Sequence, residues 1–328
     1  MIVKIAVFGA SGLLGSAVCR SIIRRGYSLL AYSNKESVTF SDQYRTKQMP
    51  FSDDNQLTRE LFDQWPGAVI NCAAISSPDT VDKSPELARL INVEGATRLA
   101  SISAHIGARF IHISTDMVFD GKKSPYRSTD QPNPLSEYGR QKLDAEKKIL
   151  SVTDENLVVL RVTLLNGNSP LGRRSQHEKI LRALASGSTL TLFEDELRQP
   201  CSAENLSDII VELTERPNLN GLYHWAGSEE VSRYELGVRI LKRFGINPDN
   251  ILRGSIENDE GKGQRPQHVS FILEPLTLIL SHKVTCVSDY VISRKVVQLL
   301  CRKKSIRIYN YPPDINEINK NSLNIREE

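Results

Sequence analysis

The sequence predicts an α/β fold in which helices cover both faces of a doubly wound parallel sheet. Two observations predict it. Short apolar runs alternate with helical patterns from the N-terminus onward, and this alternation is typical of parallel sheets wound with helices. The chain also opens on a compact example of the repeating unit, because the apolar run 2–8 leads through the glycine-rich segment 9–15 into a helical pattern that Gly26 closes.

Length and composition indicate a globular protein of about two domains. The chain has 328 residues, of which 40% are hydrophobic and 25% are charged, and these proportions are typical of soluble folds. No run approaches the roughly 18 consecutive apolar residues of a membrane helix, so no membrane partner is expected. The run 2–8 has no basic stretch before it and is accounted for as a strand, which argues against a signal peptide.

The cysteines and the charge exclude two further classes of function. Five cysteines are scattered along the chain without zinc-ligand spacing, so we expect reduced thiols, a cytoplasmic location and no metal site. The formal charge of +3 originates at the C-terminal end, because the segment from Leu276 onward holds nine Lys/Arg and five Asp/Glu. The rest of the chain is nearly neutral and gives no reason to expect a nucleic-acid partner.

Segment 9–15 has the glycine spacing of a pyrophosphate-binding turn. Gly9 would make the tight turn after the first strand, Gly12 would let the backbone approach the phosphates, and Gly15 would let the helix lie close to the strand. The amide hydrogens at the start of a helix lack partners within it and carry partial positive charge, so an anion binds there. Similar glycine spacing occurs in ordinary turns, but the flanking strand and helix favour a dinucleotide cofactor.

The end of the second predicted strand, 29–32, bears on the choice of cofactor. An acidic residue there binds the ribose 2′-hydroxyl of NAD, whereas a cationic one accommodates the 2′-phosphate of NADP. Here the strand is followed by Ser33, Asn34 and Lys35, with no carboxylate before Glu36. These side chains can donate to a phosphate, so NADP is favoured and NAD is the alternative. Lys35 can also be interpreted as a solvated loop residue.

The next elements continue the sheet. A short helix around Leu61 precedes a predicted strand at 68–71. Ser84 as N-cap and Pro85 at the first helical position then open a helix that runs to about His105. The pattern continues with a strand at 110–114, a helix at 136–150 and a buried strand at 157–162.

The second half of the chain differs from the first in composition and in the regularity of its pattern. Residues 166–174 are rich in Gly, Asn, Pro and Arg and are predicted to form a loop. Further elements are predicted as helices at 178–185 and 202–214 and a strand at 222–225. Ser232 and Glu235 have the spacing of a capping box that opens a helix ending at Gly245. Residues 306–328 are polar and asparagine-rich, which predicts a flexible tail.

Three polar side chains form a candidate catalytic group. Thr115 follows the strand at 110–114, at the end where open α/β sheets bind ligands. Tyr138 and Lys142 are four residues apart and therefore share one helix face, although many surface helices contain such a pair. An ammonium near a phenol stabilises the phenolate, so Lys142 is predicted to lower the pKa of Tyr138 toward neutrality. Thr115 would then share a substrate oxygen with the phenol while hydride moves at carbon.

Further motifs accompany these groups. The most discriminating is Ser-Thr-Asp-x-Val-Phe-Asp-Gly at 114–121. The others are 9–15, 71–74, Asp79 with Asp82, Asn92 with Val93, 138–142 with Asp144 and Glu146, Leu160 with Arg161, 221–227, and Gln264 with Arg265 and Pro266. Together they resemble the extended short-chain dehydrogenases/reductases. Within that group the resemblance is to the family of dTDP-4-dehydrorhamnose reductase and the regulatory beta subunit of methionine adenosyltransferase, and it is expected to end near Pro275.

The resemblance implies a role for each matching position. At the pyrophosphate turn the implied residues are Gly9, Ser11, Gly12, Leu13, Leu14 and Gly15. Beside the adenosine ribose and phosphate they are Cys72, Ala73 and Ala74. Thr115, Tyr138 and Lys142 would form the catalytic triad, with the nicotinamide beside Tyr138 and Lys142, and the chain would pass the nicotinamide at Leu165.

The same resemblance implies the domain organisation. A Rossmann-type NADP-binding domain is expected at 1–165, and residues 203–227 return to it. A smaller, interleaved α/β lobe for the substrate or partner is expected at 166–202 and 228–275. Residues 276–328 are expected to be an atypical C-terminal tail.

Two expected functions follow from the family. Segment 221–229 and the pair Arg198 and Pro200 look closer to the regulatory subunit than to the reductases. The resemblance then implies an NADP-binding subunit that docks on a catalytic methionine adenosyltransferase and supports S-adenosylmethionine synthesis, with a triad that is inherited rather than used. The alternative is an NADPH-dependent reductase whose substrate is a dTDP-4-keto sugar nucleotide.

Some other residues invite functional interpretations. His112 and His224 are isolated within apolar patterns and are interpreted as packed structural histidines, and Cys72 as a small packing residue. Arg173 and Arg174 are interpreted as a solvated charge pair in the predicted loop, with contact to a nucleotide phosphate as the alternative.

Overall fold

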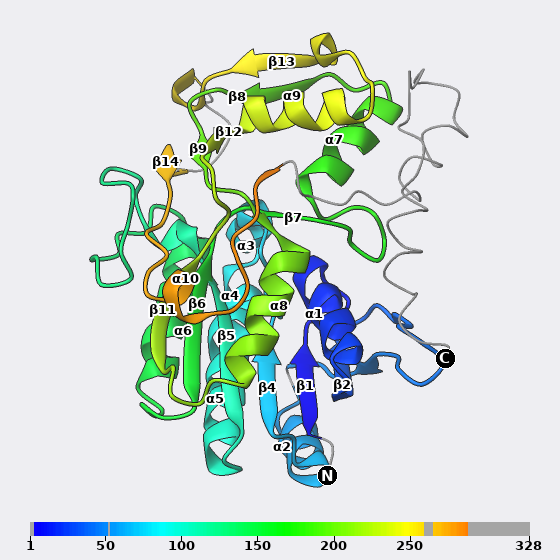
Figure 1. The fold of residues 1–328 in the computed structure, drawn as a ribbon, viewed down its shortest axis with the longest axis vertical. Helices are drawn as coiled ribbons and strands as arrows, with labels where there is room; N and C mark the ends of the chain where they lie inside the picture. Colours follow the sequence, from blue (N-terminus) through cyan, green and yellow to red (C-terminus); the bar gives the residue numbers. More distant parts are fainter. Residues whose placement is uncertain (1–2, 52, 259–264, 288–328) are drawn as a thin grey trace.

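The computed structural model describes residues 3–51, 53–258 and 265–287. Its main body is a seven-stranded parallel sheet in the order β11-β6-β5-β4-β1-β2-β3, which confirms the predicted doubly wound α/β fold (Figure 1). The strands are β1 (Lys4–Phe8), β2 (Ser28–Ser33), β3 (Lys47–Gln48), β4 (Ala68–Asn71), β5 (Arg109–Thr115), β6 (Leu157–Val162) and β11 (Gly221–Trp225).

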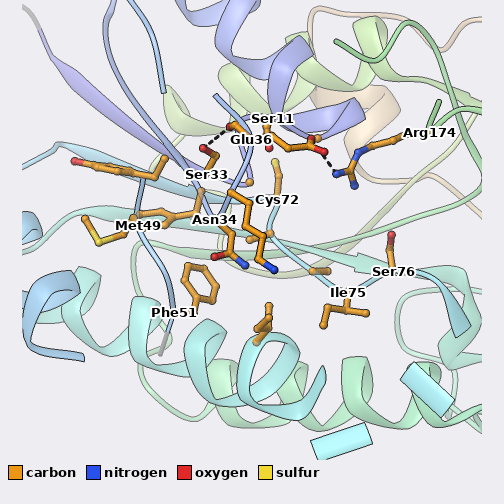
Figure 2. A pocket seen from close by; sticks show the side chains of 18 of the residues that line it. Ser11, Ser33, Asn34, Glu36, Met49, Phe51, Cys72, Ile75, Ser76 and Arg174 are labelled. Atoms are coloured by element: carbon orange, nitrogen blue, oxygen red, sulfur yellow. Dashed lines mark hydrogen bonds and ion pairs between the residues drawn. The ribbon is translucent and has the colours of Figure 1, made fainter. Parts of the chain in front are cut away.

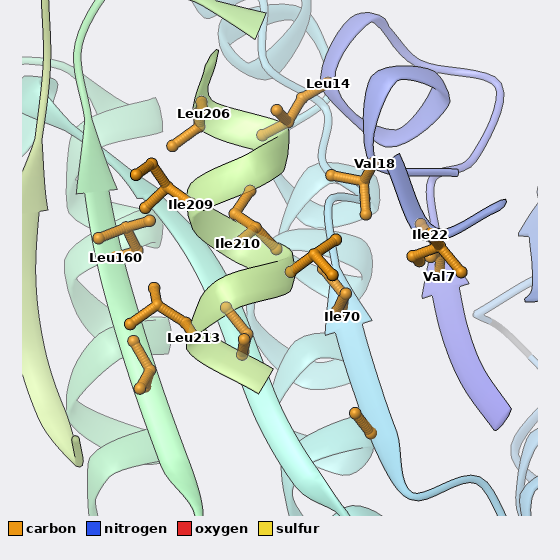
Figure 3. Packing of buried hydrophobic residues seen from close by; sticks show 14 of the residues in the cluster. Val7, Leu14, Val18, Ile22, Ile70, Leu160, Leu206, Ile209, Ile210 and Leu213 are labelled. Carbon is orange, nitrogen blue, oxygen red and sulfur yellow. The ribbon is translucent and has the colours of Figure 1, made fainter. Parts of the chain in front are cut away.

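Helices cover both faces of this sheet. On one face, α1 (Leu13–Arg24) and α8 (Ala203–Thr214) lie against β1, β4 and β6, and their apolar side chains form one core cluster (Figure 3). On the other face, α2 (Asp54–Gln64), α5 (Ala96–His105) and α6 (Glu137–Leu150) contribute to a second cluster. Successive residues of a strand point to opposite faces, so β1, β4 and β6 each supply both clusters and are almost continuously apolar.

The position of β1 sets the place of the ligand crevice. The chain runs from β1 outward to β2 and β3 on one side, and β4, β5 and β6 follow on the other side. The strand order therefore reverses at β1, where Phe8 pairs with Asn71 at the carboxyl ends of β1 and β4. Open α/β sheets bind ligands at such a reversal. The glycine turn begins at this point, immediately after Phe8.

The long helix predicted from Ser84 to His105 contains a wider turn. It comprises α4 (Pro85–Arg89), the π-helical turn η1 (Leu90–Gly95) and α5. Within η1, the side chain of Asn92 accepts a hydrogen bond from the amide of Ile75 (2.8 Å) and donates one to its carbonyl (3.1 Å). This contact joins the helix to the loop after β4, a non-local feature that the local helical pattern does not encode.

Serine side chains cap several helices. At the start of α9 (Arg233–Arg243), Ser232 accepts a hydrogen bond from the amide of Glu235 (3.0 Å), while the carboxylate of Glu235 pairs with Arg239. A complete capping box is formed by Ser175 and Glu178 at α7 (Gln176–Ala185). The sequence pattern therefore finds the correct helix start at α9 and misses the complete capping box at α7.

Three small sheets lie outside the main sheet, together with α7 and α9 (Figure 1). We call these elements the second lobe. Its strands are β7 (Leu165–Asn166), β8 (Leu190–Phe193), β9 (Leu197–Arg198), β10 (Cys201–Ser202), β12 (Val231–Ser232), β13 (Ile251–Gly254) and β14 (His268–Val269). Apolar residues of α7, α9, β8 and β13 form a separate core, which includes Ile180, Leu236 and Ile251.

The described part of the predicted C-terminal tail packs on the main body. Short helix α10 (Leu276–Ile279) buries Leu276 in the same cluster as α1 and α8. The carboxylate of Glu212 on α8 accepts hydrogen bonds from the amide of Ser281 (2.8 Å) and pairs with His282 (2.6 Å). The remaining residues of the predicted tail, 288–328, lie outside the described residues. Within the described ranges, no helix is long and apolar enough to cross a membrane.

Candidate functional site

The glycine turn after β1 brings three backbone segments into close contact. Gly9 has a φ of +80°, and a Cβ atom there would lie 2.6 Å from the amide nitrogen of Ala73. A Cβ at Gly15 would collide with the carbonyl group of Gly9. Gly12 is the N-cap of α1 and has no side chain to cap it, so the first amide hydrogens of α1 remain available to an anion. The turn thus requires the absence of side chains where the sequence motif predicts it.

A cavity of about 410 Å³ lies at the ends of β1, β2 and β4 (Figure 2). Most of the predicted cofactor residues line it. They are Gly9, Ser11, Gly12, Ser33, Asn34, Lys35, Cys72, Ala73 and Ala74. Further lining residues that the sequence pattern did not indicate are Phe8, Tyr32, Met49, Phe51, Ile75, Ser76, Ser77, Thr80 and Ile91.

The other predicted cofactor residues lie beside this cavity. Leu13, Leu14 and Gly15 form the first turn of α1 and are not among the lining residues, and Leu14 is buried in the core cluster. Leu165 is the first residue of β7, where it packs against the same cluster. Their predicted contacts with pyrophosphate and nicotinamide remain predictions.

Glu36 and two arginines meet at one edge of the cavity. Arg173 and Arg174 both pair with the carboxylate of Glu36, and Arg174 lines the cavity (Figure 2). The hydroxyl of Ser33 donates a hydrogen bond to the backbone carbonyl of Glu36 (2.7 Å), which holds the loop after β2 against this pair. Both side chains are about half exposed, at 50% and 45%, which agrees with the interpretation as a solvated charge pair, and the alternative contact with a nucleotide phosphate stays a prediction. Lys35 and Arg174 line the cavity together with Glu36, at the strand end where the rule places the cofactor ribose.

Substitutions at this edge are expected to change cofactor preference. Glu36→Gln removes the competing carboxylate and releases both guanidinium groups, so the affinity for NADPH should rise about tenfold relative to NADH. Arg174→Met should lower the affinity for NADPH about tenfold and leave NADH binding nearly unchanged. Calorimetric titration of each variant with NADPH and with NADH measures the two affinities and their ratio.

A matched variant controls for general effects on the loop. Arg173 also pairs with Glu36 but is not among the residues that line the cavity, so Arg173→Met should change the NADPH to NADH ratio less than Arg174→Met does. Equal changes in affinity for the two cofactors in Glu36→Gln would contradict the prediction that a 2′-phosphate binds at this edge.

The three residues of the predicted triad are not among those that line the cavity, but Tyr138 packs against Ile75, which does line it. Thr115 ends β5, and its hydroxyl donates to Asp116 (3.1 Å) and shares a hydrogen bond with the phenol of Tyr138. Tyr138 and Lys142 lie on the buried face of α6. The Nζ atom of Lys142 donates to the carbonyl of Ile113 (2.7 Å). The geometry gathers the three side chains at the end of β5, and their catalytic roles remain a prediction.

The pKa of Tyr138 differs from the sequence-based expectation. Burial raises the pKa of Tyr138, and the nearby carboxylate of Asp116 raises it further. Lys142 contacts His112 (2.9 Å) and Ile113, and burial lowers the pKa of Lys142 itself to about 8. The prediction that Lys142 lowers the pKa of Tyr138 toward neutrality is therefore wrong.

A buried ion pair fixes the strand that carries Thr115. Arg161 on β6 and Glu146 on α6 pair at 2.7 Å, with side chains that are 3% and 2% exposed. The hydroxyl of Ser114 on β5 donates to the same carboxylate, and the guanidinium of Arg161 stacks over the ring of Phe119. The pair therefore ties β5, β6 and α6 together directly behind the candidate triad.

Cationic side chains of the second lobe face the triad. Arg198 lies 3.4 Å from the carboxylate of Asp116 and 3.3 Å from that of Glu196, which Arg233 also approaches (3.7 Å). Burial lowers the pKa of Lys179, and the neighbouring Arg233 lowers it further. We call Lys179, Arg198, Arg233 and Arg265 the cationic cluster.

The cationic cluster suits an anionic ligand on the second-lobe side of Asp116. The sequence indicated Arg198 and Arg265 through their motifs with Pro200 and Pro266, but it gave no signal for Lys179 or Arg233. Each of those two lies on an ordinary amphipathic helix or at its start. Within the described residues, no group of three or more His, Cys, Asp or Glu side chains could hold a metal ion.

Comparison with known proteins identifies the family. A family model described as the RmlD substrate binding domain matches residues 3–285. The chain belongs to this family. The match continues past Pro275, so the expectation that the resemblance ends there is wrong, and the packed segment around α10 is part of the family's fold.

Individual relatives carry different names. Methionine adenosyltransferase 2 subunit beta of Xenopus laevis is 31% identical over 265 residues, which cover 79% of this chain and 77% of that protein. Spore coat polysaccharide biosynthesis protein SpsK of Bacillus subtilis (strain 168) is 31% identical over 267 residues, which cover 81% and 87%. The solved structure of a hypothetical dTDP-4-dehydrorhamnose reductase from Sulfolobus tokodaii matches with a TM-score of 0.74 at 26% identity, covering 88% of this chain and 100% of that one.

Proposed function

We propose that this family member is a cytoplasmic, NADP-binding regulatory subunit of methionine adenosyltransferase that supports S-adenosylmethionine synthesis. The observation that carries the proposal is the 31% identity to methionine adenosyltransferase 2 subunit beta, which spans 79% of this chain. That span is too long to lie within the sheet domain alone, so the likeness extends into the second lobe. In this proposal, residues 166–202 and 228–275 supply the surface for the catalytic subunit.

The residues of the cavity fit the proposed cofactor. Gly9 and Gly15 leave the space that a diphosphate needs, because a Cβ atom at either position would meet backbone atoms. Lys35 and Arg174 lie at the edge of the cavity, where a 2′-phosphate would meet positive charge. When bound, the nicotinamide would supply hydride chemistry. The chain's own residues hold and orient the cofactor: α1 at the diphosphate, and Tyr138 and Lys142 beside the reacting end.

A second candidate function is reduction of a 4-keto sugar nucleotide. The cationic cluster favours it, because Arg198 and Arg233 lie beside Asp116, next to Thr115 and Tyr138, and would attract the diphosphate of such a substrate. In this role the phenol of Tyr138 would donate a proton to the substrate oxygen, and the hydroxyl of Thr115 would hold that oxygen in place.

One experiment with two readouts separates the candidates. The full chain and its Tyr138→Phe variant are each incubated with a catalytic methionine adenosyltransferase subunit and, separately, with NADPH and a dTDP-4-keto sugar. The regulatory function predicts that both forms co-purify with the enzyme and change its affinity for methionine equally. The reductase function predicts NADPH oxidation that Tyr138→Phe abolishes.

Each candidate has a result that would exclude it. If the folded, cofactor-loaded chain neither co-purifies with the catalytic subunit nor alters its affinity for methionine, the regulatory proposal fails. If no 4-keto sugar nucleotide is turned over, the reductase proposal fails.

A further inference from the structure

A continuous set of buried hydrogen bonds links the cofactor cavity to Lys142. Asn71 on β4 and His112 on β5 are paired in register, and the Nδ2 atom of Asn71 lies 3.2 Å from Nδ1 of His112. The Nε2 atom of His112 lies 2.9 Å from Nζ of Lys142. All three side chains are at most 2% exposed. At the other end, the amide of Ala73, a residue that lines the cavity, donates to Oδ1 of Asn71 (3.0 Å).

The amide of Ala73 fixes the direction of every bond in this set. A backbone N–H only donates, so the atom of Asn71 that faces Ala73 must be the carbonyl oxygen. The amino group of Asn71 therefore faces His112 and donates to Nδ1. A neutral imidazole carries one proton, and since Nδ1 accepts, that proton lies on Nε2. Nε2–H is consequently a donor directed at Nζ of Lys142.

An ammonium group has no lone pair to accept that hydrogen bond, whereas a neutral amine has one. We propose that Asn71 and His112 hold Lys142 as a neutral amine in the cofactor-free protein at neutral pH. In this state Nζ accepts from His112 and donates to the carbonyl of Ile113. Asn71 and His112 act on Lys142 and not on a ligand, so they are positioning residues.

Burial moves Lys142 toward this state, and the hydrogen bond from His112 supplies the rest, because a pKa of about 8 alone leaves an ammonium at pH 7. Burial lowers the pKa of Lys142 to about 8, while Glu146 on α6 and Cys72 after β4 oppose that change. A hydrogen bond accepted by the neutral amine lowers the pKa further. Burial also lowers the pKa of His112, so the ring stays neutral and has a single proton to place. Tyr138, on the same face of α6, is neutral because burial raises its pKa.

The rival arrangement reverses the amide of Asn71. Nδ1 of His112 would then carry the proton and donate to Asn71, and Nε2 would accept from a Lys142 ammonium. This arrangement turns the amino group of Asn71 toward the amide hydrogen of Ala73, so two donors face each other and the Ala73 amide loses its partner. The two arrangements place the histidine proton on different nitrogens, which makes them distinguishable by spectroscopy.

The neutral amine has a consequence for binding that rests on the proposed NADP site. An anionic cofactor beside Lys142 favours the ammonium form, so Lys142 takes up a proton as the cofactor binds. Binding would then be weaker as the pH rises, because the proton becomes scarcer. The protein would also take up close to one proton per cofactor at neutral pH.

The primary test uses the cofactor-free, full-length protein labelled with ¹⁵N-histidine and ¹³C-lysine. NMR reads the protonated nitrogen of His112 and the titration of Lys142 directly. We expect the Nε2–H form of His112 and a Lys142 whose titration midpoint lies below pH 7. A proton on Nδ1, or a Lys142 that is still mainly an ammonium at pH 7, would overturn the proposal. This result does not depend on whether the protein binds NADP.

A pair of isosteric variants provides the second test. Asn71→Asp keeps the acceptor for Ala73 and presents a second oxygen to His112, so the histidine proton should move to Nδ1 and the proton affinity of Lys142 should rise tenfold or more. Asn166→Asp is the matched control, because Asn166 is also buried and contacts a buried histidine, His177, at 2.9 Å. The control should leave the titration of Lys142 unchanged.

Proton uptake connects the network to the cofactor. Calorimetry of NADPH binding in buffers of different ionisation enthalpy should give close to one proton taken up by the wild type and markedly less by Asn71→Asp. If NADPH does not bind at all, the proposed function fails while the NMR result still decides the state of Lys142. If NADPH binds with equal uptake in the wild type and Asn71→Asp, the link between Asn71 and Lys142 is refuted.

Discussion

Replacing Gly15 with alanine is expected to weaken NADPH binding about 100-fold. The added Cβ would lie 2.7 Å from the carbonyl carbon of Gly9, a backbone atom that cannot rotate away, and closer still to the carbonyl oxygen. Relief of this contact moves the first turn of α1 away from β1 and with it the amide hydrogens that hold the diphosphate. Loss of two such charge-assisted hydrogen bonds costs about 3 kcal/mol, which is roughly a 100-fold change in Kd.

Fluorescence titration with NADPH measures this loss, and Gly26→Ala is the control. Gly26 lies in the loop after the same helix with a φ of +79°, and a Cβ there meets nothing within 4 Å. Its replacement strains the backbone by about 1 kcal/mol and should lower stability without changing NADPH affinity. Unchanged NADPH binding by folded Gly15→Ala would show that α1 is not the diphosphate site.

Breaking the buried pair of Glu146 and Arg161 is expected to cost about 3–5 kcal/mol of folding free energy. Glu146→Gln leaves the guanidinium of Arg161 without its carboxylate, and the hydroxyl of Ser114 loses its charged acceptor. An unpaired charge in a site that is 3% exposed has no water to solvate it. Urea denaturation monitored by circular dichroism measures the difference between the variant and the wild type.

The double variant Glu146→Leu with Arg161→Met tests the cause. It removes both charges together and fills the space with apolar side chains, so it should be less destabilised than Glu146→Gln although it changes more atoms. If the double variant loses as much stability as Glu146→Gln, then altered packing, and not the unpaired charge of Arg161, accounts for the loss.

The elements of the main sheet were predictable because their signals are local. The predicted strand at 157–162 coincides with β6, and the helix from Ser136 coincides with α6 and its cap. In the second lobe, β7, β9 and β10 are each two residues long. Strands of that length have no readable period, and only their partners from distant parts of the chain make them strands.

The residues of the candidate site likewise divide into those with a local sequence signal and those without one. The glycine turn and the spacing of Tyr138 and Lys142 are encoded within a few residues and could be found. The pairing of Glu36 with Arg173 joins residues 137 positions apart, and the contact of His112 with Lys142 joins two different elements. The rise in the pKa of Tyr138 comes from burial beside Asp116, a three-dimensional property that the Tyr-x-x-x-Lys spacing does not contain.

The connections between the main sheet and the second lobe limit how the protein can move. Within the described residues the backbone crosses between them after β6, between β10 and α8, after β11 and after β14. Rotation of the second lobe about any one of these connections is resisted by the other three. A two-domain protein joined by a single flexible linker has no such restraint. We therefore expect a ligand to enter through local rearrangement, such as separation of the Glu36 and Arg174 side chains, and not through a rigid-body rotation of the second lobe.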